Sequence, residues 1–507
     1  MTLELINGKI YTLAHNNSIR EALVIEKNII TKVGTTQEIL ESNADKHIDQ
    51  VIDLQNKVVL PGFIDGHTHL GHMALESLWI DLSKIESKGQ ILKLIKDRSR
   101  DTSVGNWVVG VGYDDASWEN EERLSKVELD AISIDHPIFV RRVCGHYGVV
   151  NSIALQYIDE SWKYVDRKTG ILLEDAVLGF MKIIRPDISV RLSGTQKLFP
   201  EVYSLGLTAV REIVNLQSIK MYHLLDKEKQ LKLRVYGYII IDDLDDYLAK
   251  YPEGIIKTAR FNLVGVKILL DGSLGARTAA LQEPYNDAPG NNGKLLYSEY
   301  ELTTIFKRIK ELGYPMMVHA IGDRAIRQFV DIYKTVFSEQ IPDNPLGHSL
   351  EHLEVIDDSL LSTLKRLGIY ASLQPNFAGR WSAPGGLNEK RLGSERLARC
   401  NAYKDFLKKG IPIVFGSDSM PLDPLFGIKS AIYHPIRNQR LQPFDAVKAY
   451  VQNCYKILGL DSKFGSLVPG KIADLVILTG DPFQDQNLDK IEVAGTIIDG
   501  ELVYYSF

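Results

Sequence analysis

The sequence has few cysteines, with only Cys144, Cys400 and Cys454 among 507 residues. An odd number of widely spaced cysteines argues against a disulfide framework and favours a reducing, cytoplasmic environment. The first residues also lack the charged and apolar regions of a signal peptide. We therefore expect a cytoplasmic protein.

Long apolar runs and long basic runs are missing as well. No stretch approaches the roughly 18 to 20 apolar residues of a membrane-spanning helix, so no membrane association is expected. A net charge of -6 without a basic run argues against a nucleic-acid binder. The 45% hydrophobic and 24% charged residues are typical of a soluble globular enzyme with a large core.

Both ends of the chain are rich in short strand-like runs and turns. The Asn7-Gly8 and Asp499-Gly500 pairs each predict a hairpin, and residues 22–30 and 473–478 read as further strands. Chain termini often lie close together. We therefore expect residues 1–58 and 465–507 to form one composite β-sandwich domain.

The middle of the chain alternates strand-like runs with helical patterns, which predicts βα units and a parallel sheet. The candidate strands are 58–63, 207–212, 233–238, 264–269, 315–319, 350–352, 370–373 and 411–415. Eight is the number that a closed (β/α)8 TIM-like barrel needs, so we predict an α/β barrel over residues 59–464. The first two strands are too far apart for one helix, which predicts an inserted substrate or lid region at about 72–200.

His67 and His69 form the most informative motif. On a strand, an i, i+2 spacing directs both imidazole rings to the same side. Imidazole nitrogen is the commonest protein ligand for zinc and similar metals. The pair therefore resembles half of a metal site.

Further polar residues stand at the ends of other predicted strands. Lys267 lies inside an apolar run, His319 ends the fifth strand, His352 lies in the sixth, and Asp418 follows the eighth. In such a barrel the active site lies at the carboxyl ends of the strands. A lone buried ammonium is costly, so Lys267 needs a partner, a depressed pKa or a covalent change.

The chain resembles the amidohydrolase superfamily of metal-dependent hydrolases, and within it the branch that contains N-substituted formamide deformylases. The resemblance runs along nearly the whole chain. It rests on LPGFIDGHTH (60–69), KILLDGSLG (267–275), VHAIGD (318–323), EH (351–352), GSD (416–418) and GSLVPGKIADL (465–475). The order and spacing of these motifs make the resemblance specific.

The resemblance implies a role for six residues. His67, His69 and Asp418 would hold one metal, His319 and His352 a second, and a carboxylated Lys267 would bridge the two. Zinc suits this ligand set best. Two alternatives stay open: Lys267 remains uncarboxylated beside a single metal, or Asp418 is a helix cap.

The implied reaction is cleavage of a C–N bond, in an amide or an N-formyl amine, by metal-bound hydroxide. Asp418 would take the proton and pass it to the leaving amine. The rival hypotheses are a mononuclear deaminase of the same superfamily and a catalytically silent scaffold. The expected partner is a small-molecule amide-type substrate, and the resemblance suggests a homodimer.

Substrate contacts are predicted at His146, Tyr113, Trp107 and Phe377. For each of them, packing in a loop or in the core of the inserted region is the alternative. His348 is placed near the site or at the surface. Relatives often carry arginine where this chain has Ser349, so the arginine's role does not transfer.

Overall fold

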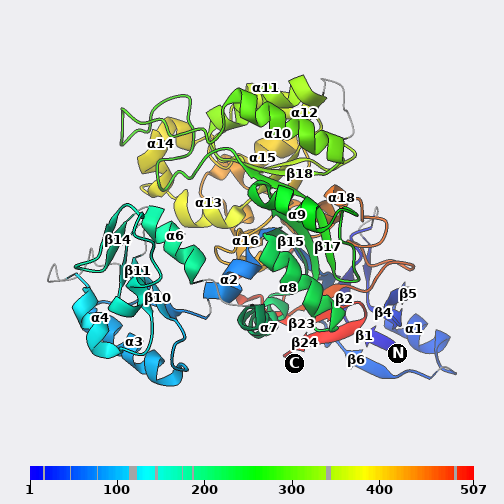
Figure 1. Ribbon diagram of the computed structural model, residues 1–507. Helices are drawn as coiled ribbons and strands as arrows, with labels where there is room; N and C mark the ends of the chain where they lie inside the picture. The colour runs from blue at the N-terminus through cyan, green and yellow to red at the C-terminus, as the bar shows by residue number, and fades with distance from the viewer. Residues whose placement is uncertain are drawn as a thin grey trace. The chain divides into compact units, whose positions relative to one another are not determined.

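The computed structural model describes the chain except for residues 15–17, 46, 77, 114–122, 143–146, 174, 185–187, 338–343, 485–487 and 507. The chain separates into two compact units (Figure 1). One unit combines Met1–His69 with Phe199–Phe507, and the other is Leu70–Leu198.

The first unit contains a barrel sheet of eight parallel strands whose order follows the chain. These strands are β8 (Phe63–Thr68), β15 (Leu207–Val214), β16 (Arg234–Ile240), β17 (Phe261–Leu269), β18 (Met316–Ala320), β19 (Ser349–His352), β20 (Tyr370–Leu373) and β21 (Ile413–Phe415). The predicted α/β barrel is confirmed.

The last strand closes against the first. The backbone N–H of Asp418 donates to the carbonyl oxygen of His67 at 2.8 Å, and the Asp65 carboxylate accepts the N–H groups of His67 and Ser417. A Cβ atom on Gly416 would lie 2.4 Å from the His67 nitrogen, and one on Gly66 would lie 2.7 Å from the Phe415 oxygen. Glycine at both positions is what allows β8 and β21 to approach so closely.

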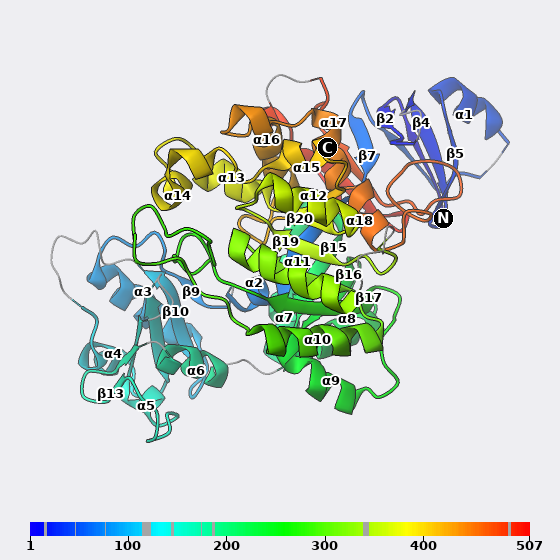
Figure 2. The ribbon, with the colours of Figure 1, turned by 90° about the horizontal axis from the view of Figure 1, so that it is seen from above.

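Helices follow the barrel strands (Figure 2). They are α8 (Leu216–Lys227), α9 (Leu244–Lys250), α10 (Glu299–Leu312), α11 (Asp323–Phe337), α12 (Asp358–Arg366), α13 (Pro375–Trp381), α14 (Leu387–Leu397), α15 (Tyr403–Lys408), α16 (Pro424–Ile432), α17 (Pro443–Ala449) and α18 (Gln452–Ile457). Of these, α8, α11, α15, α17 and α18 contact strands of the barrel sheet. Helix α11 is typical, because it buries Ile326, Phe329 and Tyr333 on one face, at the i, i+3, i+7 spacing of an amphipathic helix. Helix α10 ends at Gly313, whose φ of 67° suits glycine.

Two further sheets form the sandwich from both ends of the chain (Figure 1). One sheet has the order β5 (Ile29–Gly34), β4 (Ala22–Glu26), β1 (Thr2–Ile6) and β6 (Gln50–Asp53), and α1 (Thr36–Ser42) follows β5. The other has the order β24 (Glu501–Tyr505), β23 (Val493–Ile498), β22 (Leu475–Leu478), β7 (Val58–Pro61), β2 (Lys9–Tyr11) and β3 (Ile19–Arg20). One hydrophobic cluster joins both sheets and includes Leu5, Leu23, Val59, Leu475 and Ile497.

The structure corrects two local predictions. The apolar run from Val58 is not the first barrel strand: β7 pairs with β2 and β22 in the sandwich, and the barrel begins with β8 after Gly62. Asn7-Gly8 does not turn a hairpin, because β1 and β2 lie in different sheets and the chain crosses between them there. The hairpin at Asp499-Gly500 is confirmed, with φ angles of 58° and 75° at the two turn residues.

The second unit is built on a six-stranded mixed sheet. Its strands are β13 (Val165–Asp166), β14 (Ile171–Leu173), β12 (Tyr147–Val150), β11 (Ile138–Arg142), β10 (Val108–Tyr113) and β9 (Ile80–Asp81). Its helices are α2 (Leu70–Glu76), α3 (Lys88–Asp101), α4 (Lys126–Ile132), α5 (Ser152–Leu155), α6 (Asp175–Ile183) and most of α7 (Ile188–Ser204). Two hydrophobic clusters lie entirely within it, one around Phe139 and Phe180 and one around Ile95 and Tyr113.

Across the described part of the chain, no helix combines the length and the apolar character needed to cross a bilayer.

Candidate metal centre

The candidate ligands stand at the carboxyl ends of the barrel strands, as the sequence predicts. They are His67 in β8, His69 directly after it, Lys267 in β17, His319 in β18, His352 at the end of β19 and Asp418 after β21. Because these strands belong to one barrel sheet, residues up to 351 positions apart in sequence meet at one rim.

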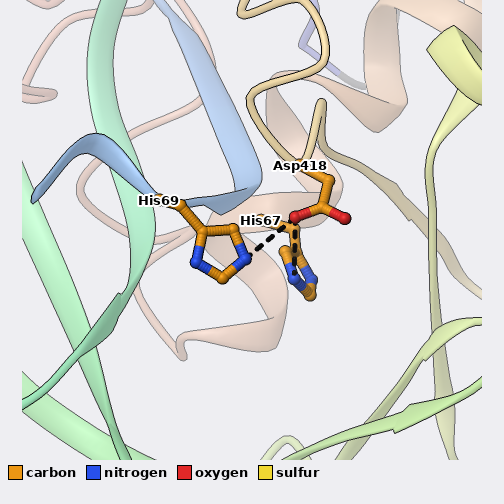
Figure 3. Close-up of side chains that lie close together, drawn as sticks. All are labelled: His67, His69 and Asp418. Carbon is orange, nitrogen blue, oxygen red and sulfur yellow. Dashed lines mark ion pairs between the residues drawn. The ribbon is translucent and has the colours of Figure 1, made fainter. Parts of the chain in front are cut away.

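His67, His69 and Asp418 form the tightest group (Figure 3). The Oδ1 atom of Asp418 lies 2.9 Å from His69 Nε2 and 3.6 Å from His67 Nε2. The three ligand atoms fall within 4.8 Å of one another, and no other group of three ligating residues occurs in the ranges that the structure describes. Two imidazoles and a carboxylate in this geometry fit a divalent metal such as zinc.

The three side chains differ in their exposure to solvent. The His67 side chain is 1% exposed, whereas His69 is 37% and Asp418 14% exposed. Burial would raise the pKa of Asp418, but His67 and His69 hold it at about 2. Asp418 is therefore an anion at neutral pH and can both bind a cation and accept a proton.

Lys267, His319 and His352 complete the rim. The Lys267 ammonium donates to His67 Nε2 at 3.2 Å, and the His352 ring centroid lies 5.0 Å from that of His67 and 4.4 Å from that of His319. Burial lowers the pKa of Lys267 to about 8, although Glu351 and Asp418 act in the opposite direction. The Nδ1 atom of His352 is buried and has no hydrogen-bond partner among the described residues. This nitrogen is therefore available to a ligand.

Asp271 lies beside the His319 and His352 pair, with its Oδ1 atom 3.4 Å from His319 Nε2. Its carboxylate already accepts the backbone N–H groups of Ala280, Ile321 and Gly322 at 2.8 to 3.0 Å. His319 Nε2 lies 3.1 Å from the Gly272 carbonyl oxygen, to which it can donate. Asp271 therefore fixes the loop beside His319.

The backbone is unusual at both sides of the centre. His352 and Asp418 have φ angles of 73° and 53°, in the left-handed region, and the residue after each shares that conformation. For residues other than glycine this costs about 1–3 kcal/mol each and is common at functional sites. The strain falls on two of the six residues that the sequence predicts as ligands.

Glu351 has a role that the sequence did not assign. Its Oε2 atom accepts the Nδ1–H of His67 at 2.7 Å, and its side chain is fully buried. A carboxylate behind a histidine ligand fixes the tautomer, so Nε2 keeps its lone pair for the metal. A glutamate in a buried strand, directly before a candidate ligand, was the available signal.

Of the predicted substrate residues, Phe377 lies at the centre. Its ring stacks on His352 with 5.9 Å between centroids and 5° between planes, and Trp381 packs against it at 4.8 Å. Trp107 and Tyr113 lie in the Leu70–Leu198 unit, in its two hydrophobic clusters, while His146 lies outside the described residues. Phe377 and Trp381 of α13 thus form an apolar wall beside the candidate ligand His352.

His348 is not a ligand. It is 3% exposed, and its Nδ1 accepts the backbone N–H of Met316 at 3.0 Å. Its ring packs between Tyr333 and Phe337 of α11, on the outer side of the barrel. The residue supports the fold there.

Comparison with known proteins agrees with this geometry. Residues 50–504 match the model of the amidohydrolase family. A putative amidohydrolase, YtcJ of Bacillus subtilis, is 29% identical over 98% of both chains, and an N-substituted formamide deformylase of Arthrobacter pascens is 24% identical over 99% of this chain and 98% of its own.

A solved structure agrees as well. An uncharacterized metal-dependent hydrolase from Pyrococcus furiosus superposes with a TM-score of 0.84 and 28% identity, covering 96% of this chain and 100% of its own. The chain therefore belongs to the amidohydrolase family and is a metal-dependent hydrolase.

Proposed function

We propose that this protein hydrolyses the C–N bond of a small amide, with an N-formyl amine as the preferred class. The observation that carries the proposal is the convergence of His67, His69 and Asp418 within 4.8 Å, beside Lys267, His319 and His352. A divalent metal bound there would polarise the scissile carbonyl and lower the pKa of water toward about 7.

The residues of this chain would divide the remaining work. His67 and His69 supply imidazole nitrogen, and Glu351 orients the first of them. Asp418 Oδ1 accepts the proton of the attacking water and passes it to the amine nitrogen as the C–N bond breaks. Its carboxylate form and its partial exposure support this role.

The proposal gives Lys267 and the second histidine pair a shared role. Buried and with a pKa of about 8, Lys267 has a larger fraction of neutral amine than an exposed lysine, and a neutral amine is the form that reacts with carbon dioxide. The resulting carbamate would offer oxygen atoms to a second metal at His319 and His352. Without it, the centre holds one metal.

Two observations favour an N-formyl amine. The Phe377 and Trp381 rings form an apolar wall beside His352, which suits the substituent on the nitrogen rather than a charged group. In addition, the Arthrobacter pascens relative is an N-substituted formamide deformylase, and this chain aligns with 98% of that protein's length.

Metal removal tests the proposal. Formate release from a panel of N-alkyl and N-benzyl formamides should disappear after chelation and return on addition of Zn²⁺, Mn²⁺ or Co²⁺. His69→Ala should abolish activity, whereas His223→Ala, on the exposed side of α8, should retain it. Full activity in metal-free protein would contradict the proposal.

A deaminase with one metal is the second candidate. The single group of three ligating residues among the described side chains favours it, because one metal is enough for that chemistry. Ammonia release from aminated heterocycles, with no cleavage of formamides or other amides, would identify this activity instead.

A further inference from the structure

Arg211 is a cation buried inside the barrel, in strand β15. Its side chain is fully buried, and its guanidinium lies over the Tyr238 ring at 4.9 Å. Burying a charge is costly unless it is paired and hydrogen-bonded. The groups that contact Arg211 therefore indicate its role.

Those partners lead to the metal centre. Arg211 Nη2 donates to Ser349 Oγ at 2.9 Å and lies 3.6 Å from Glu351 Oε1. Arginine has donors only, so the Ser349 hydroxyl must accept here and can donate its own proton onward. It does so to Glu351 Oε1 at 2.5 Å.

The chain of hydrogen bonds ends at a candidate ligand. The other carboxylate oxygen of Glu351 accepts the Nδ1–H of His67 at 2.7 Å. These hydrogen bonds run in one direction, from the guanidinium through the hydroxyl to the carboxylate. The tautomer of His67 that results presents Nε2 toward Asp418, 3.6 Å away.

We propose that Arg211 is a positioning residue for the metal centre: through Ser349 it orients Glu351, and Glu351 in turn orients His67. This rests on the proposed role of His67 as a metal ligand. It gives a role at the centre to a residue of β15, a strand that supplies no candidate ligand.

The charges around Glu351 explain why a cation is needed. This carboxylate is fully buried, with Arg211 Nη2 3.6 Å from its Oε1 and His67 Nδ1 2.7 Å from its Oε2, and Lys267 is a third basic group close enough to interact with it. Carboxylation would convert Lys267 into an anion, and metal binding keeps His67 neutral. Of these three groups, only Arg211 would then remain a cation.

A pair of arginine variants tests the inference. Arg211→Met removes the charge, and Arg234→Met is the matched control, because Arg234 is also buried in a barrel strand but pairs with Asp474. The Zn²⁺ dissociation constant is measured by competition with a chromophoric chelator, and the Co²⁺-loaded protein is followed by its visible absorption spectrum.

The two variants should separate stability from positioning. Both should lower the melting temperature. Only Arg211→Met should weaken Zn²⁺ binding, by about 10- to 100-fold, as is typical when a partner behind a ligand is lost, and only it should alter the Co²⁺ spectrum. Equal behaviour of the two variants in both metal measurements would overturn the inference.

Two further variants, one of which leaves Arg211 in place, cover the case in which Arg211→Met alone does not fold. Ser349→Ala removes the bridging hydroxyl but leaves Arg211 facing Glu351, so a smaller loss of Zn²⁺ affinity is expected. In the double variant Arg211→Met with Ser349→Arg, the new guanidinium can fill the vacated space beside Glu351 and should recover much of the affinity. Wild-type Zn²⁺ affinity in Ser349→Ala, together with no recovery in the double variant, would also overturn the inference.

The proposed function can fail separately. If the wild-type protein binds neither Zn²⁺ nor Co²⁺ at this centre, the proposed function falls. If the wild type binds both metals and Arg211→Met binds them equally well, only the role of Arg211 is lost.

Discussion

Asp418 combines an anionic carboxylate with a left-handed backbone conformation, at φ 53°. Asp418→Asn keeps an oxygen that can face the metal but removes the base. We expect kcat/KM to fall by about 10²- to 10⁴-fold, the usual contribution of a proton-transfer group, while part of the bound metal is retained. Steady-state kinetics and metal analysis on the same preparations check this.

The control for Asp418→Asn is Asp358→Asn, at a side chain that is 78% exposed on α12. It should leave kcat/KM unchanged. Wild-type activity in Asp418→Asn would show that another group moves the proton.

His348 makes stability depend on pH. Burial lowers its pKa to about 4 from the ordinary 6.5, so the unfolded chain binds the extra proton more readily. The contribution of neutral His348 to the free energy of unfolding is therefore fully present above pH 6.5. It is lost as the pH falls from 6.5 toward 4, and the loss is on the order of 3 kcal/mol. His348→Asn should retain the acceptor for Met316 N–H and show a shallower loss of stability over that range.

Urea denaturation at several pH values between 4 and 7 measures this difference. His47→Asn, at a ring that is 89% exposed, is the matched control and should follow the wild type. If the free energy of unfolding of His348→Asn depended on pH as steeply as that of the wild type, the ring would not be buried in its neutral form.

At this scale the sequence predicted the six candidate ligands but not what supports them. The ligands have informative spacing: His67 and His69 are two positions apart at the end of β8, and the others lie near the carboxyl ends of β17, β18, β19 and β21. Arg211, Ser349 and Glu351 lie on two strands that are not adjacent in the sheet. Their contact depends on how the barrel curves, which no local pattern records.

The contact between β8 and β21 makes Gly416 a sensitive position. In Gly416→Ala the new Cβ would meet the His67 nitrogen at 2.4 Å and must push the strands apart. Such overpacking typically costs about 1–3 kcal/mol. Because Asp418 follows two residues later, Zn²⁺ affinity should fall as well.

Gly290→Ala is the comparison, since nothing lies within 4 Å of a Cβ atom there. Its melting temperature and Zn²⁺ affinity should match those of the wild type. If Gly416→Ala matched them too, the closure of the barrel would not depend on that contact.

The element boundaries show where pattern reading fails. The run from Val58 through Phe63 is apolar, and only the Pro61-Gly62 pair, a turn signal, marks the boundary between β7 and β8. The change of sheet occurs at Gly62, where a Cβ would lie 2.2 Å from Thr208 Cγ2. Likewise, Asn7-Gly8 favours a tight turn between β1 and β2. Instead, β1 pairs with β4 and β6, strands that lie further along the sequence.

For the whole molecule, the Leu70–Leu198 unit should fold by itself. Its two hydrophobic clusters draw only on residues of that range, and its size is that of an ordinary domain. Residues 70–198, expressed alone, should give a cooperative thermal transition by circular dichroism.

The fragment 199–507 is the informative comparison. It lacks β8 and the amino-terminal strands of the sandwich, so it should not unfold cooperatively. A gradual, non-cooperative transition in residues 70–198 would show that this unit needs the rest of the chain.

The closure between β8 and β21 also has a consequence for the order of events during synthesis. His69 and Ser419, which hydrogen-bond in the finished protein, are 350 positions apart. At about 5–20 residues per second, the ribosome needs roughly 20–70 s to pass from one to the other. During that interval the nascent chain carries two histidines without their carboxylate, so a metal that needs all three residues would be bound tightly only near the end of translation.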